Sequence, residues 1–364
     1  MHLDVPKFLN AYLTFVNRMV PKPARDPVIG IDIGTSAIKA VVIAVNADGI
    51  LELNSWAIER IEGGDVKAAL SVVLKRVGFT SQVPVTSVSG KGTLIRYIDM
   101  PRMPLEDLRK SFTYDLDKYF PFDPQSIYTD CFILDRQNKD KRMSVLVAAV
   151  KKEMVDERIK LFKEVGMELS HITINSIATA NAFERLGPPK IPPPVAGPVP
   201  PEVGQAKAIL DIGGAVSNIL VIKDISPCFT RDIFIGSQEI TKHIANILGV
   251  DAAQADWLKH VPGERSVEVM AACEAALSQL VAEIRLSLDY FMTEKNFQVD
   301  ELFLLGGGSL LKGIEAVFEK SLGIPVKTWN PLAGLRLGPL VDASQTQAFS
   351  AQLGVAIGLG VVTV

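Results

Sequence analysis

Two short segments of the chain each place an aspartate at the end of an apolar stretch and a glycine two residues later. Residues 31–43 read IDIGTSAIKAVVI, and residues 210–222 read LDIGGAVSNILVI. Glycine has no Cβ, so nearby backbone N–H groups can approach phosphate oxygens and form a concave anion site. Aspartates can hold a hydrated Mg²⁺, which uses few carboxylates and keeps several waters. The two segments predict a nucleoside triphosphate held between similar halves, with Mg²⁺ near Asp32 and Asp211.

Polar side chains of the first segment support this prediction. Lys39 follows the first turn, and its ammonium group can reach a phosphate as a point charge. Thr35 and Ser36 lie in the turn and supply hydroxyl donors. A cation and two hydroxyls beside a glycine turn are suited to a phosphate chain.

A third glycine segment lies near the end of the chain. Residues 304–310 read LLGGGSL, which predicts a buried strand that opens into a helix over residues 309–321. Three glycines before a helix allow close approach of a ring, a sugar or a phosphate. The segment matches neither the Walker A pattern nor GxGxxG. Each turn alone is more often an ordinary β-turn, so the prediction depends on their order and on the duplication.

Composition excludes several classes of protein. The chain has 364 residues, 48% of them hydrophobic, and a formal net charge of −3. This length predicts two domains, and this composition excludes a disordered chain. The near-neutral charge and 7% aromatic content argue against a nucleic-acid binder. The three cysteines form no CxxC pair and the four histidines no HExxH motif, so neither a disulfide framework nor a zinc hydrolase is expected, and a reducing cytoplasm fits.

A proline-rich stretch divides the chain. Residues 187–204 contain eight prolines and predict a linker or surface loop. On each side, residues 28–186 and 205–364 begin with a strand meander and continue with alternating helices and strands. This order predicts an α/β protein whose mixed sheets are covered by helices.

The two ends of the chain show different apolar patterns. The longest apolar run, residues 353–364, is shorter than the roughly 20 residues of a spanning helix and predicts a buried terminal helix. The first 27 residues show no secretory signal. Within them, residues 7–20 predict an amphipathic helix that packs on its own domain, docks on a partner or lies on a membrane surface. Its apolar residues are Phe8, Tyr12, Phe15 and Met19.

The order of the three glycine segments resembles the actin/hexokinase/DnaK-type ATPase superfamily. Within it, residues 100–134, MPRMPLEDLRKSFTYDLDKYFPFDPQSIYTDCFIL, are similar to the type IV pilus assembly protein PilM family, relatives of the division protein FtsA. The shared features are an MPxMPxxxL start, a PF pair and a D-x-x-x-L strand. The resemblance covers nearly all of residues 28–364. It implies an actin-like ATPase fold: two duplicated α/β domains with smaller inserted subdomains, about 59–139 and 246–299, flanking a nucleotide cleft.

The resemblance also implies ATP and Mg²⁺ as cofactors and assigns residues to them. Asp32 and Asp211 are expected at the Mg²⁺, through water. The first phosphate motif matches Asp32, Gly34, Thr35, Ser36 and Lys39; the second matches Asp211, Gly213 and Gly214; the adenosine motif matches Gly306, Gly307, Gly308 and Ser309.

Residues 255–259, ADWLK, are similar to an AExLK segment that contacts ribose and base in FtsA-like proteins. The resemblance therefore adds Asp256 and Lys259 to the nucleotide-binding residues, although Asp256 replaces a longer glutamate. Without the resemblance, the two residues are equally consistent with an ion pair on a helix surface, since they are three positions apart.

ATP hydrolysis is expected to be slow or absent. Related ATPases often use an acid or a glutamine to position the attacking water, and here the corresponding residues are Asn175-Ser176 and Ser217-Asn218. A neutral amide can orient water but cannot accept a proton as a carboxylate does. Asn175 is the candidate for positioning water, no residue is assigned as catalytic, and the nucleotide is expected to act as a structural switch.

The PilM resemblance implies a cytoplasmic scaffold at the inner face of the inner membrane, in pilus biogenesis and twitching motility. Its partners would be the N-terminal tail of a PilN-like inner-membrane protein, other pilus-assembly components including the motor, and further copies of itself. The inserted subdomain would build part of the groove for the tail. Membrane contact would be indirect or through the N-terminal helix.

Two alternatives remain open. One is an FtsA-like, membrane-associated filament protein, with the N-terminal helix as its anchor. The other is a small-molecule kinase on the same fold, which needs a catalytic carboxylate facing the terminal phosphate. The sequence offers no strong candidate beyond Asp32 and Asp211, which suit Mg²⁺ better.

Overall fold

The computed structural model describes residues 26–46, 48–134, 141–188, 206–223, 226–295 and 297–362. The predicted N-terminal helix at residues 7–20 lies outside these ranges, as does the proline-rich stretch after residue 188. In the described part of the chain, no helix combines the length and apolar composition that crossing a membrane requires.

The first half forms a six-stranded mixed sheet in the order β14-β3-β2-β1-β4-β8. Its first three strands form an antiparallel meander, and β4 and β8 continue in parallel. The helices α2 (Val66–Val77) and α4 (Lys152–Glu164) pack on one face, and α5 (Asn175–Leu186) packs on the other. The strands are β1 (Val28–Ile33), β2 (Ala37–Val45), β3 (Leu51–Arg60), β4 (Val83–Val88), β8 (His171–Ile174) and β14 (Arg336–Leu337).

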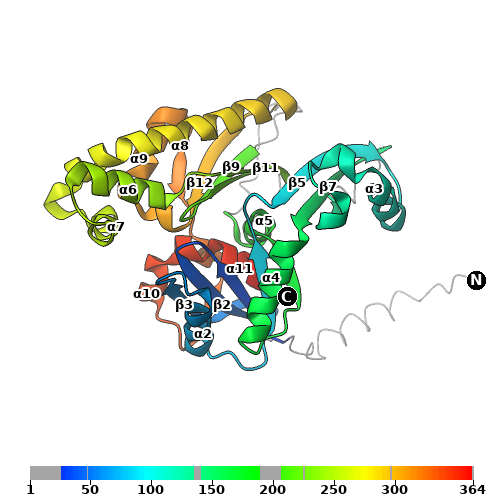
Figure 1. The fold of residues 1–364 in the computed structure, drawn as a ribbon, viewed down its shortest axis with the longest axis horizontal. Helices are drawn as coiled ribbons and strands as arrows, with labels where there is room; N and C mark the ends of the chain where they lie inside the picture. Colours follow the sequence, from blue (N-terminus) through cyan, green and yellow to red (C-terminus); the bar gives the residue numbers. More distant parts are fainter. Residues whose placement is uncertain are drawn as a thin grey trace, which may run out of the picture.

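The second half forms a five-stranded sheet in the order β11-β10-β9-β12-β13. Figure 1 shows this sheet with its helices at the upper left and the first sheet below it. The strands are β9 (Ala206–Ile212), β10 (Ser217–Lys223), β11 (Ser226–Ile233), β12 (Val299–Leu305) and β13 (Val326–Thr328). The helices are α6 (Ser237–Leu248), α7 (Ala252–His260), α8 (Ser266–Lys295) and α9 (Ile314–Leu322).

The duplication read from the sequence is present at the level of strand register. In the β1–β2 pair, Asp32 lies opposite Lys39, and in the β9–β10 pair, Asp211 lies opposite Asn218. The two halves therefore present the same hairpin, with an aspartate at the same position.

A separate three-stranded sheet, β5-β7-β6, carries the helix α3 (Leu105–Tyr119) and has its own core. It lies at the upper right in Figure 1. Its strands are β5 (Thr93–Pro101), β6 (Ile127–Ile133) and β7 (Arg142–Lys151). The expected insertion over 59–139 is therefore displaced. Helix α2 packs on the first sheet and β4 pairs with β1 in it, while β7 extends the insertion to residue 151.

The end of the chain returns to the first half, which corrects the expectation that all of residues 205–364 form the second domain. Strand β14 pairs with β3, and α10 (Ala343–Ala348) is tied to β3 by a 2.8 Å hydrogen bond from Trp56 Nε1 to Thr346 Oγ1. The last helix, α11 (Gly354–Gly360), is buried along its whole length between β1 and α5. The prediction that the terminal apolar run forms a buried helix is confirmed for these residues.

The helix expected over residues 309–321 is interrupted. A 3₁₀ turn at Gly307–Leu310 comes first, and α9 begins only at Ile314, because Gly313 adopts a left-handed conformation with φ of 86°. The other 3₁₀ turns are Pro124–Ser126, Gly263–Arg265, Pro331–Gly334 and Ser350–Leu353.

Candidate nucleotide-binding site

The two aspartate turns lie against each other. The backbone N–H of Ala215 donates a 3.1 Å hydrogen bond to Thr35 Oγ1. The side chain of Gln238 donates one of 3.1 Å to Ser36 Oγ. A Cβ on Gly214 would collide with both hydroxyls, so glycine is required for this contact. The structure therefore brings the first and second predicted turns together.

The two turns have the same internal geometry. The N–H of Gly34 donates to Ala37 O at 3.1 Å, and the N–H of Gly213 donates to Val216 O at 3.1 Å. Each turn thus follows an aspartate with a tight, glycine-containing loop. Thr35, Ser36 and Gly214, all assigned from the sequence, lie at the junction.

Asp32 is buried and forms an ion pair of 2.9 Å with Lys39. Burial lowers the pKa of Lys39, but the charge of Asp32, their hydrogen bond and the charge of Asp211 together raise it above its usual value. Lys39 therefore stays charged between the two aspartates. A fixed cation at this position is suited to a phosphate group.

Asp211 is half-buried, and its burial followed by the charge of Asp32 raises its pKa to about 6, although Lys39 opposes the shift. The two carboxylates therefore repel each other, and one Lys39 charge does not fully balance them. A divalent cation would relieve this repulsion. In the described residues no group of three or more His, Cys, Asp or Glu side chains could enclose a metal. Two carboxylates fit a Mg²⁺ that is held mainly by phosphates and water.

Two buried polar atoms fit an anionic ligand at this end of the first sheet. Among the described residues, Ser87 Oγ and Arg158 Nη1 are the buried side-chain N or O atoms without a hydrogen-bond partner. Strand β4 runs parallel to β1 with Thr86 beside Ile31, so Ser87 is next to Asp32 in register. Such orphaned donors are rare in folded proteins and indicate a missing partner.

The third glycine segment lies beside the second turn. Gly306 has φ of 81°, and a Cβ there would collide with Asp211 Oδ1 and Ile212 O. Ser309 Oγ donates to Gly306 O at 2.7 Å and fixes the loop. A Cβ on Gly307 would meet open space, whereas one on Gly308 would meet Ile212. Gly307 therefore leaves open space one residue after the contact of Gly306 with Asp211, and its contact with adenosine stays a prediction.

Asp256 and Lys259 form the ion pair that their spacing allows, at 2.7 Å. Asp256 also pairs at 2.7 Å with Arg60 of β3, which connects the second half to the first. Burial raises the pKa of Asp256, but the hydrogen bonds and charges of Lys259 and Arg60 lower it to about 2. Lys259 is almost fully buried and also donates to Thr241 Oγ1 at 2.9 Å. The predicted contact of this pair with ribose stays a prediction.

The two amide positions assigned to water have different surroundings. Asn175 begins α5 directly after β8, at the same end of the first sheet as Asp32. Asn218 occupies the position equivalent to Lys39, and its side chain donates to Asp232 Oδ1 at 2.8 Å. Its amide is therefore held by the second half itself. A role of Asn175 in positioning water stays a prediction.

Three functional candidates were missed by sequence reasoning. Arg60, Arg158 and Asp232 all contact or lie near residues far away in the chain, and none belongs to a recognisable motif. Of the three, only Arg158 could have been noticed in the sequence. It lies four residues before Phe162 and four after Met154, so on a helix it would share a face with these two apolar residues.

Comparison with known proteins agrees with this architecture. The sequence profile of the family described as "Type IV pilus assembly protein PilM" matches residues 30–363. A chain in the solved structure "PilM-PilN type IV pilus biogenesis complex" is 22% identical, with a TM-score of 0.78 over 92% of this chain and 97% of that one. The ethanolamine utilization protein EutJ from Carboxydothermus hydrogenoformans is 14% identical, with a TM-score of 0.52 over 97% of this chain and 98% of its own. The fold is the actin-like ATPase fold, and since the family profile spans nearly the whole sequence, the chain belongs to the type IV pilus assembly protein PilM family.

Proposed function

We propose that this protein is an ATP-binding scaffold of the type IV pilus assembly machinery. It holds ATP with Mg²⁺ between its two halves and binds the N-terminal cytoplasmic tail of a PilN-like inner-membrane protein on a separate surface. In this role it lies in the cytoplasm at the inner face of the inner membrane and links the tail to the assembly motor. The observation that carries the nucleotide proposal is the contact of the two glycine turns around Asp32, Lys39 and Asp211.

A large groove beside the inserted sheet is the candidate site for the tail. The cavity measures about 980 Å³ and lies between β6 and β7 of the insertion, α5 of the first half and Ser226-Pro227 of the second. Most of its lining is apolar. The charged residues among those that line it are Arg109, Asp130, Glu184 and Arg185. Such a groove suits a tail whose apolar side chains enter the cavity while its polar groups remain at the rim.

The edge of β6 offers a backbone for an extended tail. Among the described strands, β6 pairs only with β7, so its other edge is open. Six consecutive residues, 128–133, line the cavity, although their side chains alternate between the two faces of the sheet. The cavity therefore runs along the strand edge, where an extended peptide can be added as a further strand.

The groove and the nucleotide site share structural elements. Helix α5 begins with Asn175 at the predicted nucleotide site, and Ile177, Ala180 and Glu184 of the same helix line the groove. Ser226 and Pro227 bring the second half to the groove wall. A change in the closure of the two halves would therefore alter the groove, which is how nucleotide state would switch tail binding. Slow hydrolysis suits such a switch, and turnover of about 1 s⁻¹ or faster would contradict it.

Two exposed phenylalanines allow a matched test of the groove. Phe132 lies on β6 in the groove and is 51% exposed, while Phe234 lines a different cavity and is 52% exposed. Binding of a fluorescent peptide with the sequence of the PilN-like tail is measured by anisotropy. Phe132→Asp should weaken binding about tenfold or more, since it places a charge in an apolar site. Phe234→Asp should bind like the wild type; equal binding by both variants would refute the placement.

A further inference from the structure

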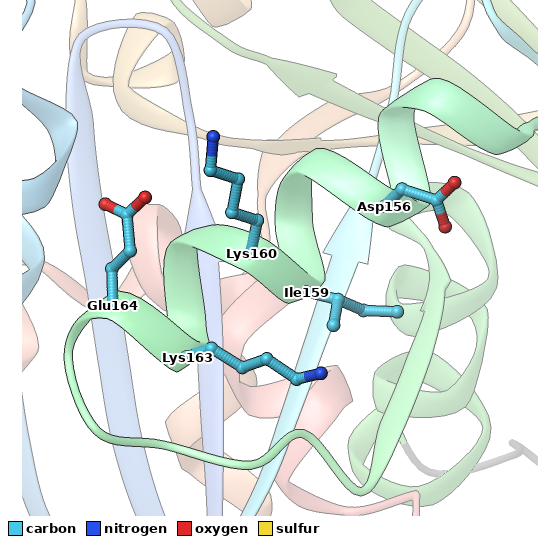
Figure 2. Close-up of a pocket in the computed structure, with 5 residues that line it drawn as sticks. All are labelled: Asp156, Ile159, Lys160, Lys163 and Glu164. Atoms are coloured by element: carbon cyan, nitrogen blue, oxygen red, sulfur yellow. The ribbon is translucent and has the colours of Figure 1, made fainter.

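Arg158 occupies an unusual position for a charged residue. It lies on α4, one turn before Phe162 and one turn after Met154, so it shares their face of the helix. Phe162 is fully buried in the core with Ile29 and Ile31 of β1. Other charged residues of α4 project elsewhere: Figure 2 shows the long side chains of Lys160 and Lys163 extending away from the helix. In Arg158, by contrast, the terminal nitrogen Nη1 is buried.

One nitrogen of the Arg158 guanidinium group lacks a partner among the described residues. Its Nη1 atom is buried and has no hydrogen bond. Burial lowers the pKa of Arg158, and the nearby charge of Asp32 raises it. Asp32 Oδ2 accepts from Lys39 at 2.9 Å, and no hydrogen bond joins Asp32 to Nη1 of Arg158. Arg158 as a whole is half-buried, but a buried guanidinium nitrogen without an acceptor is unfavourable, and a ligand that supplies one would relieve this cost.

The residues around Arg158 indicate that the ligand group at Nη1 is a phosphate. A planar guanidinium group can donate two parallel hydrogen bonds to phosphate oxygens, which is a bidentate contact. Arg158 lies near Asp32 in the first half, whereas Gly307 directly follows Gly306, which packs against Asp211 in the second half. A nucleotide whose adenosine covers Gly307 would therefore extend its phosphate chain toward Asp32 and Arg158.

We propose that Arg158 is a further nucleotide-binding residue that donates hydrogen bonds to the terminal phosphate of bound ATP and thereby makes the protein prefer ATP over ADP. This inference rests on the proposed ATP site. It assigns the discrimination between the two nucleotides to a side chain of α4, outside the three glycine segments. The hydroxyl of Ser87, orphaned next to Asp32, lies in the same region.

The test is calorimetric titration of the full chain with Mg·ATP and Mg·ADP. Arg158→Met keeps an unbranched apolar stem and removes the charged guanidinium group. Lys160→Met is the matched control, because Lys160 is exposed on the same helix. Arg158→Met should weaken ATP binding about tenfold or more and leave ADP within about twofold, the loss expected for charge-assisted hydrogen bonds. Lys160→Met should leave both affinities unchanged.

A thermal melt without nucleotide separates a binding role from a structural one. Arg158→Met should melt at the wild-type temperature or higher, because a charged group with a buried, unpartnered nitrogen is replaced by an apolar side chain. Equal weakening of ATP and ADP, or no weakening of either, would overturn the inference while leaving the ATP site intact. If the wild type binds neither nucleotide, both the proposed function and this inference fail.

Discussion

The backbone N–H of Ala215 donates to the hydroxyl of Thr35 although 180 positions separate the two residues in the chain. This hydrogen bond joins the aspartate turn of one sheet to the aspartate turn of the other. It places two carboxylates and Lys39 at one junction between the halves. The account of nucleotide binding depends on this junction, and the following predictions test its parts.

Asp32 should carry most of the effect of Mg²⁺ on ATP binding. In Asp32→Asn, the side chain keeps its size but loses the charge that attracts the cation. We expect the difference in ATP affinity between excess Mg²⁺ and EDTA to fall by about tenfold or more, which corresponds to about 1.4 kcal/mol. Asp48→Asn, at an exposed position after β2, is the control. A full Mg²⁺ effect in Asp32→Asn would contradict the metal assignment.

Asp211 should make the ligand-free protein less stable as the pH rises. Its pKa is raised to about 6 in the folded protein, against about 3.9 in an unfolded chain. The folded state therefore binds more protons between these values, and the free energy of unfolding falls as the pH rises through this window. Asp211→Asn should be more stable than the wild type at pH 7 by on the order of 2 kcal/mol, a gain that shrinks toward pH 4.

Urea unfolding at several pH values measures this effect. The same Asp211→Asn variant should bind Mg·ATP more weakly, because it lacks a carboxylate for the cation. If Asp211→Asn had the same free energy of unfolding as the wild type at every pH, the ionised Asp211 carboxylate would not be destabilised by its burial and its neighbours.

Gly307 and Gly214 should respond differently to alanine. A Cβ on Gly307 meets open space, so Gly307→Ala should keep the wild-type melting temperature and weaken ATP binding by filling the predicted adenosine surface. A Cβ on Gly214 collides with Thr35 and Ser36, so Gly214→Ala should separate the turns. It should therefore lower both the melting temperature and the ATP affinity. Unchanged ATP binding in Gly307→Ala would remove that glycine from the site.

The ion pair between Arg60 and Asp256 should restrain the closure of the two halves. Arg60→Gln should increase hydrogen exchange in α7, while the free energy of unfolding changes by no more than about 1 kcal/mol, as is usual for exposed pairs. Arg76→Gln is the control, since Arg76 pairs with Glu59 within the first half. Because the pKa of Asp256 is lowered to about 2, the restraint should persist above about pH 4 and disappear as the pH falls through 2. Identical exchange in both variants would exclude this restraint.

The sequence predicted the parts of the fold that depend on local pattern. The two hairpins were visible because their aspartate and glycine spacing repeats, and Gly34 and Gly213 indeed make equivalent turns. The buried α11 was predicted from an apolar run that is too short to span a membrane.

Features that depend on distant contacts were not predictable from one sequence. The return of β14 and α11 to the first half reflects packing against β3 and β1, and no local signal encodes it. The predicted insertion began too early in the chain, at residue 59. The sequences of α2 and β4 do not show which sheet they join, and only the pairing of β4 with β1 assigns them to the first half. Arg60 was missed for the same reason, as its partner Asp256 is 196 positions away.

A crystal structure with Mg²⁺ and a non-hydrolysable ATP analogue tests the central claim most directly. The account predicts electron density for the phosphates between the turns at Gly34 and Gly213, for Mg²⁺ within one water shell of Asp32 and Asp211, and for the base beside Gly307. Density for the analogue on any other surface, with the two turns still joined through Thr35 and Ala215, would contradict it.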